Sequence, residues 1–232
     1  MLKPGAVDVW VLELDADEAL RRDLEDTLSD DEKARAARFH FDRDRHRFIV
    51  GRGALRKILA HYLLAQPEML RFSYSEHGKP SLADISTSLR FNLSHSDQYG
   101  ILAVTGENEI GADIEKIRYE VETDKLAERF FSLNERRALR EMTASERPAA
   151  FYRGWACKES LLKAWGTGLS RPLHSFDVEL RLEHPAALLA TRPDAEEAKR
   201  WSLRMIEVSE GFASAIGAQG EIRQVSVKSW AG

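Results

Sequence analysis

Two short segments carry carboxylates and amines in spacings that suit phosphate chemistry. The first contains Asp113 and Glu115, and the second contains Lys158, Glu159 and Lys163. Side chains two residues apart on a strand point to the same face, so Asp113 and Glu115 are expected side by side if this segment is extended. Neighbouring carboxylates repel each other unless a cation lies between them. Together the acids and lysines indicate Mg²⁺-assisted attack on a phosphate ester.

The elements that position these residues follow from the local pattern. Residues 109–117 are expected to form a strand after a turn, and residues 149–165 a helix with an apolar face. On that helix Glu159 lies one turn before Lys163, which makes them neighbours. Taken alone, the first segment is also typical of an exposed acidic edge strand, and the second of a surface Glu–Lys pair without a catalytic role.

A basic segment and two loops add candidates for phosphate contacts. Residues 33–57 contain nine Lys or Arg residues, which suit a phosphate but are equally typical of a solvated helix face. Lys79 projects from a Gly-Lys-Pro turn, and His95 lies between Ser94 and Ser96. No second His or Cys stands at ligand spacing from His95, so a zinc site is not expected.

Taken in order, these motifs resemble the 4′-phosphopantetheinyl transferase superfamily, specifically its Sfp-type members. The similarity extends from about Lys33 to Val178 and rests on several motifs in the family's order. They are His77-Gly78-Lys79-Pro80, Phe91-Asn92-Leu93-Ser94-His95-Ser96, Gly111-Ala112-Asp113-Ile114-Glu115, Arg129-Phe130-Phe131-Ser132, Trp155 through Lys158-Glu159 to Lys163, and Gly166-Thr167-Gly168-Leu169.

The resemblance implies a substrate, a metal and a role for each motif residue. Coenzyme A is the implied donor of phosphopantetheine, and a serine of an apo acyl or peptidyl carrier protein is the acceptor. One Mg²⁺ is expected on Asp113, Glu115 and Glu159. Glu159 is also the expected base, directly or through water, and Lys163 offsets phosphate charge. The implied coenzyme A contacts are Arg47, Arg52, Lys79, Ser94, His95 and Lys158. For Lys158 two roles stay open, a contact with the pyrophosphate or a position that only flanks the site.

The resemblance implies an α+β fold, a pseudo-dimer of two similar α/β subdomains with the active site in the cleft between them. We divide the chain into an N-terminal subdomain, 1–106, with the contacts to the 3′-phosphate of coenzyme A, and a C-terminal subdomain, 107–232, with the metal and catalytic residues. Further strands are expected near 7–12, 70–75, 89–94, 99–104, 176–180, 203–205, 212–216 and 222–227. Helices are expected near 17–28, 33–64 with a break near Asp42, 123–131 and 132–143.

Composition limits the remaining classes of function. The net charge of −4 argues against a nucleic-acid partner, and neither a P-loop nor a Gly-rich dinucleotide motif is present for another nucleotidyl transferase. The single cysteine, Cys157, excludes an internal disulfide and is expected to be a buried thiol. No apolar run approaches 18 residues, so we expect a cytoplasmic protein with no membrane partner. The resemblance implies a monomer, because a chain of doubled length should not need the trimer that half-length family members form. A fold relative that binds carrier protein or coenzyme A without catalysis is the alternative.

Overall fold

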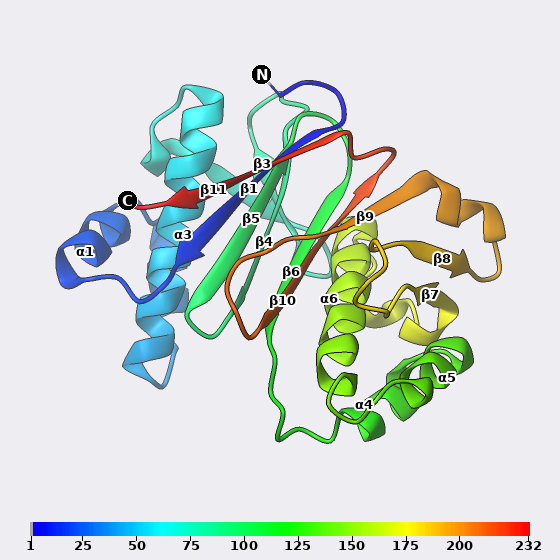
Figure 1. Cartoon of the computed structure of the whole chain (residues 1–232). Helices are drawn as coiled ribbons and strands as arrows, with labels where there is room; N and C mark the ends of the chain where they lie inside the picture. The colour runs from blue at the N-terminus through cyan, green and yellow to red at the C-terminus, as the bar shows by residue number, and fades with distance from the viewer. Residues whose placement is uncertain (1) are drawn as a thin grey trace.

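A computed structural model describes residues 2–232, apart from the side chain of Leu169, and places a long helix against a sheet in each half of the chain (Figure 1). The elements are β1 (Ala6–Glu13), α1 (Glu18–Asp26), α2 (Asp30–Ala36), α3 (Asp42–Leu63), β2 (Arg71–Tyr74), β3 (Pro80–Ala83), β4 (Arg90–Ser96), β5 (Tyr99–Thr105), β6 (Ile110–Lys116), α4 (Thr123–Phe130), α5 (Leu133–Glu141), α6 (Arg147–Trp165), β7 (Phe176–Val178), β8 (Leu188–Thr191), β9 (Trp201–Met205), β10 (Phe212–Gln219) and β11 (Gln224–Trp230). Short 3₁₀ turns span Pro67–Met69, Gly168–Ser170, Leu173–Ser175 and Ala195–Arg200.

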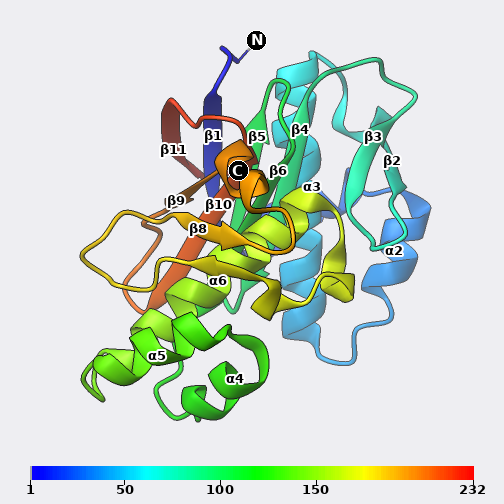
Figure 2. The same ribbon diagram turned by 90° about the vertical axis from the view of Figure 1, so that its right-hand side faces the viewer.

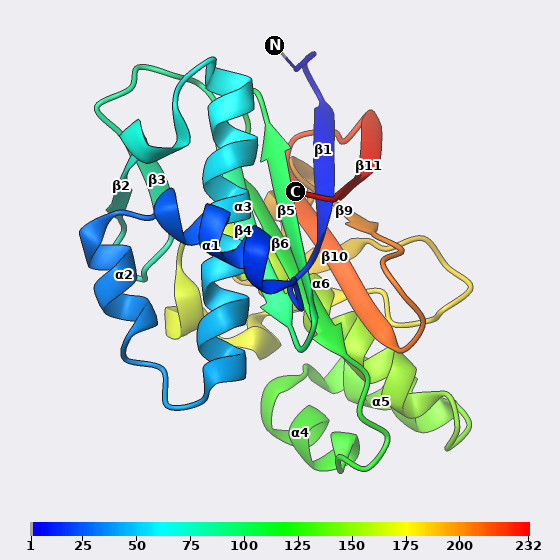
Figure 3. The ribbon, with the colours of Figure 1, turned by 90° about the vertical axis from the view of Figure 1, so that its left-hand side faces the viewer.

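The first sheet has the strand order β11-β1-β5-β4, and α3 packs on it. Strands β1, β5 and β4 are antiparallel neighbours, whereas β11 returns from the end of the chain to lie parallel to β1. Figure 3 shows β1 and β11 beside each other at the end of this sheet opposite β4. The division at 106/107 stays a prediction, but β11 qualifies it, because this part of 107–232 belongs to the first sheet.

The second sheet has the order β6-β10-β9, and α6 packs directly on its centre. Gly111 on β6 and Gly217 on β10 are paired across the ladder. A Cβ atom at Gly111 would lie 2.0 Å from the carbonyl oxygen of Ser160, so only glycine lets the α6 backbone approach this strand. Because α6 carries Glu159 and Lys163, these glycines set how close the catalytic candidates lie to Asp113.

The two sheets meet where β4 lies beside β6, and side chains join them. Asn92, Ser94 and Ser96 alternate along β4, so all three point to the same face. The Asn92 Oδ1 atom accepts the backbone N–H of Ala112 at 2.9 Å, and the Ser94 and Ser96 hydroxyls donate to the acids of β6. The cleft between the halves is therefore lined by polar groups, as a phosphate site requires.

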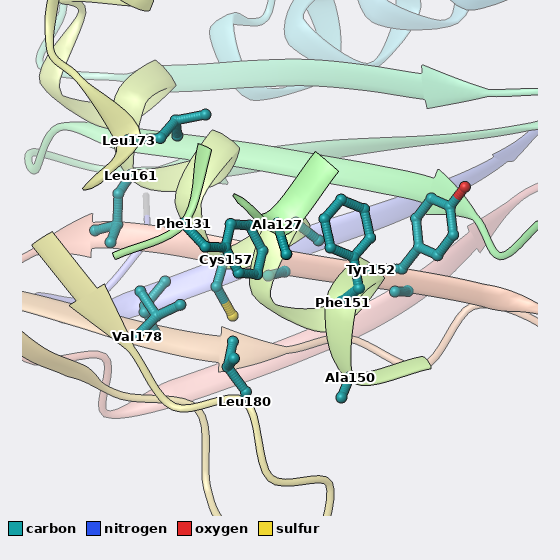
Figure 4. Close-up of a cluster of buried hydrophobic side chains, with 14 of the residues drawn as sticks. Ala127, Phe131, Ala150, Phe151, Tyr152, Cys157, Leu161, Leu173, Val178 and Leu180 are labelled. Carbon is teal, nitrogen blue, oxygen red and sulfur yellow. The ribbon is translucent and has the colours of Figure 1, made fainter. Parts of the chain in front are cut away.

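The largest buried cluster fixes α6 in the second half. Phe131, Phe151 and Cys157 lie in it with side chains from α4 and β7 (Figure 4). The Phe131 and Phe151 rings stack with their centroids 5.0 Å apart. Burial raises the pKa of the Cys157 thiol to about 12, which confirms the prediction of a buried, unreactive cysteine.

Most expected elements are confirmed, and the α+β class with them. A capping box at Ser29 begins α2, and the expected break falls before Asp42, where α3 starts. The sequence did not indicate β3 or β8, which are short and lack clear alternation. Among the described residues, no helix is long and apolar enough to cross a membrane.

Candidate active site

Asp113 is a buried residue of β6 that pairs with Lys163 of α6. It is 3% exposed, and its Oδ1 atom accepts the Lys163 ammonium at 2.6 Å and the Ser94 hydroxyl at 3.1 Å. Burial raises the pKa of Asp113, while the positive charge of Lys163 acts in the opposite direction. Its Oδ2 atom is buried without a hydrogen-bond partner. One oxygen of this carboxylate is therefore engaged by the lysine, and the other is free for a ligand.

The two other acids predicted at the site are half-buried and electrostatically linked to Asp113. Burial and then the charge of Asp113 raise the pKa of Glu115 to about 7, and the Ser96 hydroxyl donates to Glu115 at 3.2 Å. The pKa of Glu159 is raised by burial and then by Asp113. Glu159 and Lys163 share a cavity of about 230 Å³ with Lys79. A cation relieves this kind of repulsion between like charges.

The residues present fit a hard divalent cation. Within residues 2–232, no three side chains of Asp, Glu, His or Cys are gathered closely enough to form a ready-made metal site. The carboxylates of Asp113, Glu115 and Glu159 are nevertheless close enough that their charges add to burial in raising the pKa of the two glutamates, and they offer the oxygen ligands that Mg²⁺ prefers. The unpartnered Oδ2 atom of Asp113 is the observation that supports a cation there. The metal site stays a proposal.

The raised pKa of Glu115 predicts how stability without metal depends on pH. The folded protein binds a proton that the unfolded chain releases near its ordinary pKa of 4.5, so stability falls as pH rises from about 4.5 to about 7. Because Glu115 is only half-buried, we expect the free energy of unfolding to fall by about 1 kcal/mol over this pH range, which lowers the melting temperature by roughly 2–4 °C. Melting curves in EDTA at pH 5.5 and 8 test this. If Glu115→Gln showed the same difference in melting temperature between pH 5.5 and pH 8 as the wild type, Glu115 would not be its cause.

The predicted coenzyme contacts divide between two cavities along β4. Asn92 and Leu93 line the first, together with Lys79, Glu159 and Lys163. His95 lines the second, a cavity of about 470 Å³ that also contains Arg47. Desolvation and then the positive charge of Lys163 lower the pKa of His95. Ser94 stands on β4 between Leu93, which lines the first cavity, and His95, which lines the second. Its hydroxyl accepts a hydrogen bond from the Lys163 ammonium at 2.9 Å.

Lys79 reaches the first cavity from the turn before β3. Its ammonium pairs with Glu109 at 2.8 Å and lies 3.4 Å from the carbonyl oxygen of Ala164 at the end of α6. Figure 2 shows β3 and the turn that leads into it on the same side of the molecule as the C-terminal end of α6. The predicted contact of Lys79 with a phosphate or ribose remains a prediction.

Arg52 lines neither of these two cavities, and its predicted contact with coenzyme A stays a prediction that its contacts within the protein do not support. Its guanidinium is buried against Glu32 and the Tyr74 hydroxyl, and it stacks 4.4 Å from the centre of the Phe72 ring. The physical reason is helix geometry, because five positions on an α-helix turn the side chain by about 140° away from Arg47. Arg52 instead joins α3 to α2 and β2.

For Lys158, the structure favours the second of the two predicted roles, flanking the site, over a contact with the pyrophosphate. Lys158 is 0% exposed, and its ammonium pairs with Glu135 at 2.8 Å and donates to the carbonyl oxygens of Leu173 and Phe176. All of its donors are thus used inside the protein. Lys158 fixes α6 to α5 and to the segment that precedes β7, so its role is structural.

Replacing Lys158 by methionine is expected to lower the free energy of unfolding by about 3–5 kcal/mol, because removing one partner leaves the Glu135 charge buried. Urea unfolding measures this change. Lys125→Met is the matched control, since Lys125 pairs with Glu122 at the exposed surface and should lose at most about 1 kcal/mol. A stable Lys158→Met protein with an altered KM for coenzyme A would contradict the structural role.

Sequence reasoning missed residues that orient the site. Ser96 donates to Glu115, Asn92 ties β4 to β6, and Glu135 receives Lys158. A signal for the first two was present, because a polar residue at every second position of a strand next to a predicted site marks one polar face. No local signal identifies Glu135, which stands 23 positions before its partner in the sequence.

Comparison with known proteins gives a consistent result. Residues 109–216 match the model of the 4′-phosphopantetheinyl transferase superfamily, and residues 20–107 match that of the 4′-phosphopantetheinyl transferase N-terminal region. The chain is 38% identical over 216 residues to the 4′-phosphopantetheinyl transferase HetI of Nostoc sp., with 92% of this chain and 88% of the relative covered. It is 32% identical to the 4′-phosphopantetheinyl transferase Sfp of Bacillus subtilis, with 82% of each covered.

A solved structure shows a more distant similarity. The holo-acyl-carrier-protein synthase of Thermotoga maritima aligns with a TM-score of 0.40 and 21% sequence identity. The alignment covers 49% of this chain and 63% of that one.

Proposed function

Because the chain belongs to the 4′-phosphopantetheinyl transferase superfamily and is an enzyme of that class, we propose that it takes phosphopantetheine from coenzyme A in a Mg²⁺-dependent reaction. The acceptor is a serine hydroxyl of an apo acyl or peptidyl carrier protein. The products are the holo carrier and 3′,5′-ADP.

One observation carries this proposal. The Lys163 ammonium is held 2.6 Å from Asp113 in a cleft that also contains Glu159, so a cation for the phosphates and a base for the serine lie together. A coenzyme pyrophosphate placed beside Lys163 would exchange part of the lysine's pairing with Asp113 for charge-assisted hydrogen bonds to phosphate. The buried Oδ2 atom of Asp113 supports a metal next to that position.

The roles of the protein groups follow from their surroundings. The raised pKa of Glu159 makes it a stronger base than an exposed glutamate, which suits removal of the serine proton near neutral pH. Lys163 offsets the charge that develops on the leaving 3′,5′-ADP. Ser94 keeps the ammonium in place by accepting a hydrogen bond from it. Asp113, Glu115 and Glu159 would hold the Mg²⁺, which supplies charge compensation for the pyrophosphate when bound.

Intact-mass spectrometry tests the function directly. Purified protein, coenzyme A, Mg²⁺ and a panel of apo carriers are incubated, and we expect at least one carrier to gain the mass of phosphopantetheine. Chelation of Mg²⁺ by EDTA should remove the gain, and excess Mg²⁺ should restore it. A protein that binds coenzyme A but modifies none of the carriers would favour the non-catalytic alternative. The presence of all three acids and Lys163 argues against that alternative, since a non-catalytic relative would be expected to have lost at least one of them.

A further inference from the structure

Arg47 is neutralised inside the protein, although it lines the second cavity. Its Nε and Nη2 atoms donate to the two carboxylate oxygens of Asp15 at 2.7 and 2.9 Å. Its Nη1 atom donates to Asp97 at 2.6 Å. A guanidinium has five N–H groups, so one hydrogen on each terminal nitrogen remains for a ligand. An anion that binds Arg47 must therefore do so beside two carboxylates.

The two carboxylates are held differently. Asp97 lies in the turn between β4 and β5, is 22% exposed and also pairs with Lys116. Asp15 lies in the loop between β1 and α1, is 52% exposed and has Arg47 as its ion-pair partner. Asp97 is thus fixed from two sides, whereas Asp15 is held by one arginine at the surface. Of the two, Asp15 is the carboxylate that a ligand can displace.

The formal charges of Arg47 and the residues linked to it by ion pairs sum to zero. Asp15 and Asp97 contribute two negative charges, and Arg47 and Lys116 contribute two positive charges. Without Asp15 the group would carry one net positive charge. The second cavity is also lined by Arg43, Asp44 and Arg118, so pairing of Arg47 with Asp15 removes one of three arginine charges that can attract an anion there.

We propose that Asp15 is an internal counter-ion that competes with the 3′-phosphate of coenzyme A for Arg47 and so sets the affinity for the coenzyme. This rests on the proposed function, in which coenzyme A is the substrate, and on the predicted contact of Arg47 with its 3′-phosphate. A dianionic phosphate competes with a single exposed carboxylate because of its higher charge, whereas a 3′-hydroxyl does not. Asp15 therefore lowers the affinity for coenzyme A without affecting the affinity for 3′-dephospho-coenzyme A.

Calorimetric titration of the full-length protein with coenzyme A and with 3′-dephospho-coenzyme A tests the proposal. Asp15→Asn should lower the Kd for coenzyme A about three- to fivefold, the size expected for a surface ion pair, and leave the Kd for the dephospho form unchanged. The difference between wild type and variant should shrink at high salt, because screening weakens both competing interactions. A purely structural role for Asp15 would not produce this selectivity.

Asp42→Asn is the matched control, since it removes an exposed carboxylate that pairs with Arg45 on the same helix. It should change both dissociation constants by less than Asp15→Asn changes that of coenzyme A. Weaker binding of coenzyme A by Asp15→Asn, an equal change for both ligands, or no change would each overturn the proposal. The carrier assay with wild-type protein separates this result from the proposed function: transfer by wild type together with an unchanged Kd in Asp15→Asn refutes only the counter-ion.

Discussion

Replacing Glu159 by glutamine is expected to reduce the rate of phosphopantetheine transfer by about 10²- to 10⁴-fold, the contribution typical of a positioned general base. Glutamine keeps the size of the side chain but cannot accept the serine proton. It also removes one carboxylate from the proposed Mg²⁺ site, so both roles are lost together. Initial rates with saturating coenzyme A and carrier, followed by intact mass, measure the effect.

The control for this variant separates chemistry from folding. Glu141→Gln removes an exposed carboxylate from α5 and should transfer at the wild-type rate. Glu159→Gln should melt at or above the wild-type temperature in EDTA, because it removes a carboxylate whose pKa is raised by burial and by the charge of Asp113. A Glu159→Gln rate within about threefold of wild type, far from the loss expected for a general base, would show that Glu159 is neither base nor essential ligand.

Asp113→Asn is expected to lower the transfer rate by about 10²-fold or more, because a bound metal and a positioned lysine together stabilise the transition state by several kcal/mol. The asparagine side chain would keep the shape of the aspartate, but a neutral amide would replace both the partner of Lys163 and the unpaired Oδ2 atom. We expect the residual activity to require a much higher Mg²⁺ concentration. Mg²⁺ titration of the transfer rate measures this requirement.

Asp8→Asn is the matched control for Asp113. Asp8 is another buried strand carboxylate with a lysine partner, Lys228, but it lies in β1 of the first sheet. Its replacement should lower stability without changing the Mg²⁺ requirement. If Asp113→Asn kept the wild-type dependence on Mg²⁺, Asp113 would not be a metal ligand, and the proposed Mg²⁺ site would have to be formed by other residues.

Local sequence predicted the parts of the site that depend on local geometry. The alternation of a strand places Asp113 and Glu115 on one face, and both accept hydroxyls from the neighbouring β4. The spacing of one helical turn places Glu159 and Lys163 on the same side of α6, where they share a cavity. Gly111 has no side chain, which leaves room for the α6 backbone to lie against this strand.

Local sequence does not reveal the partners of charged residues when those partners are distant along the chain. Arg52 and Lys158 both belong to basic motifs, but each is buried against an acid, Glu32 or Glu135. Local pattern cannot distinguish a lysine that points into a cleft from one that is neutralised in the core, because both occupy helical positions next to apolar residues. Family resemblance indicates that such a residue matters but does not say whether it binds ligand or holds the fold.

By itself, the sequence determined the α+β class, most element positions and the identity of the catalytic candidates, because these depend on periodicity and on motifs within a few residues. The tertiary structure alone decided that β11 returns to β1, that β4 and β6 are joined by side chains, and that Arg47 is neutralised by Asp15 and Asp97. The physical reason is that burial and ion pairing are set by which segments pack together. Their free energies come from contacts between residues that are far apart along the chain.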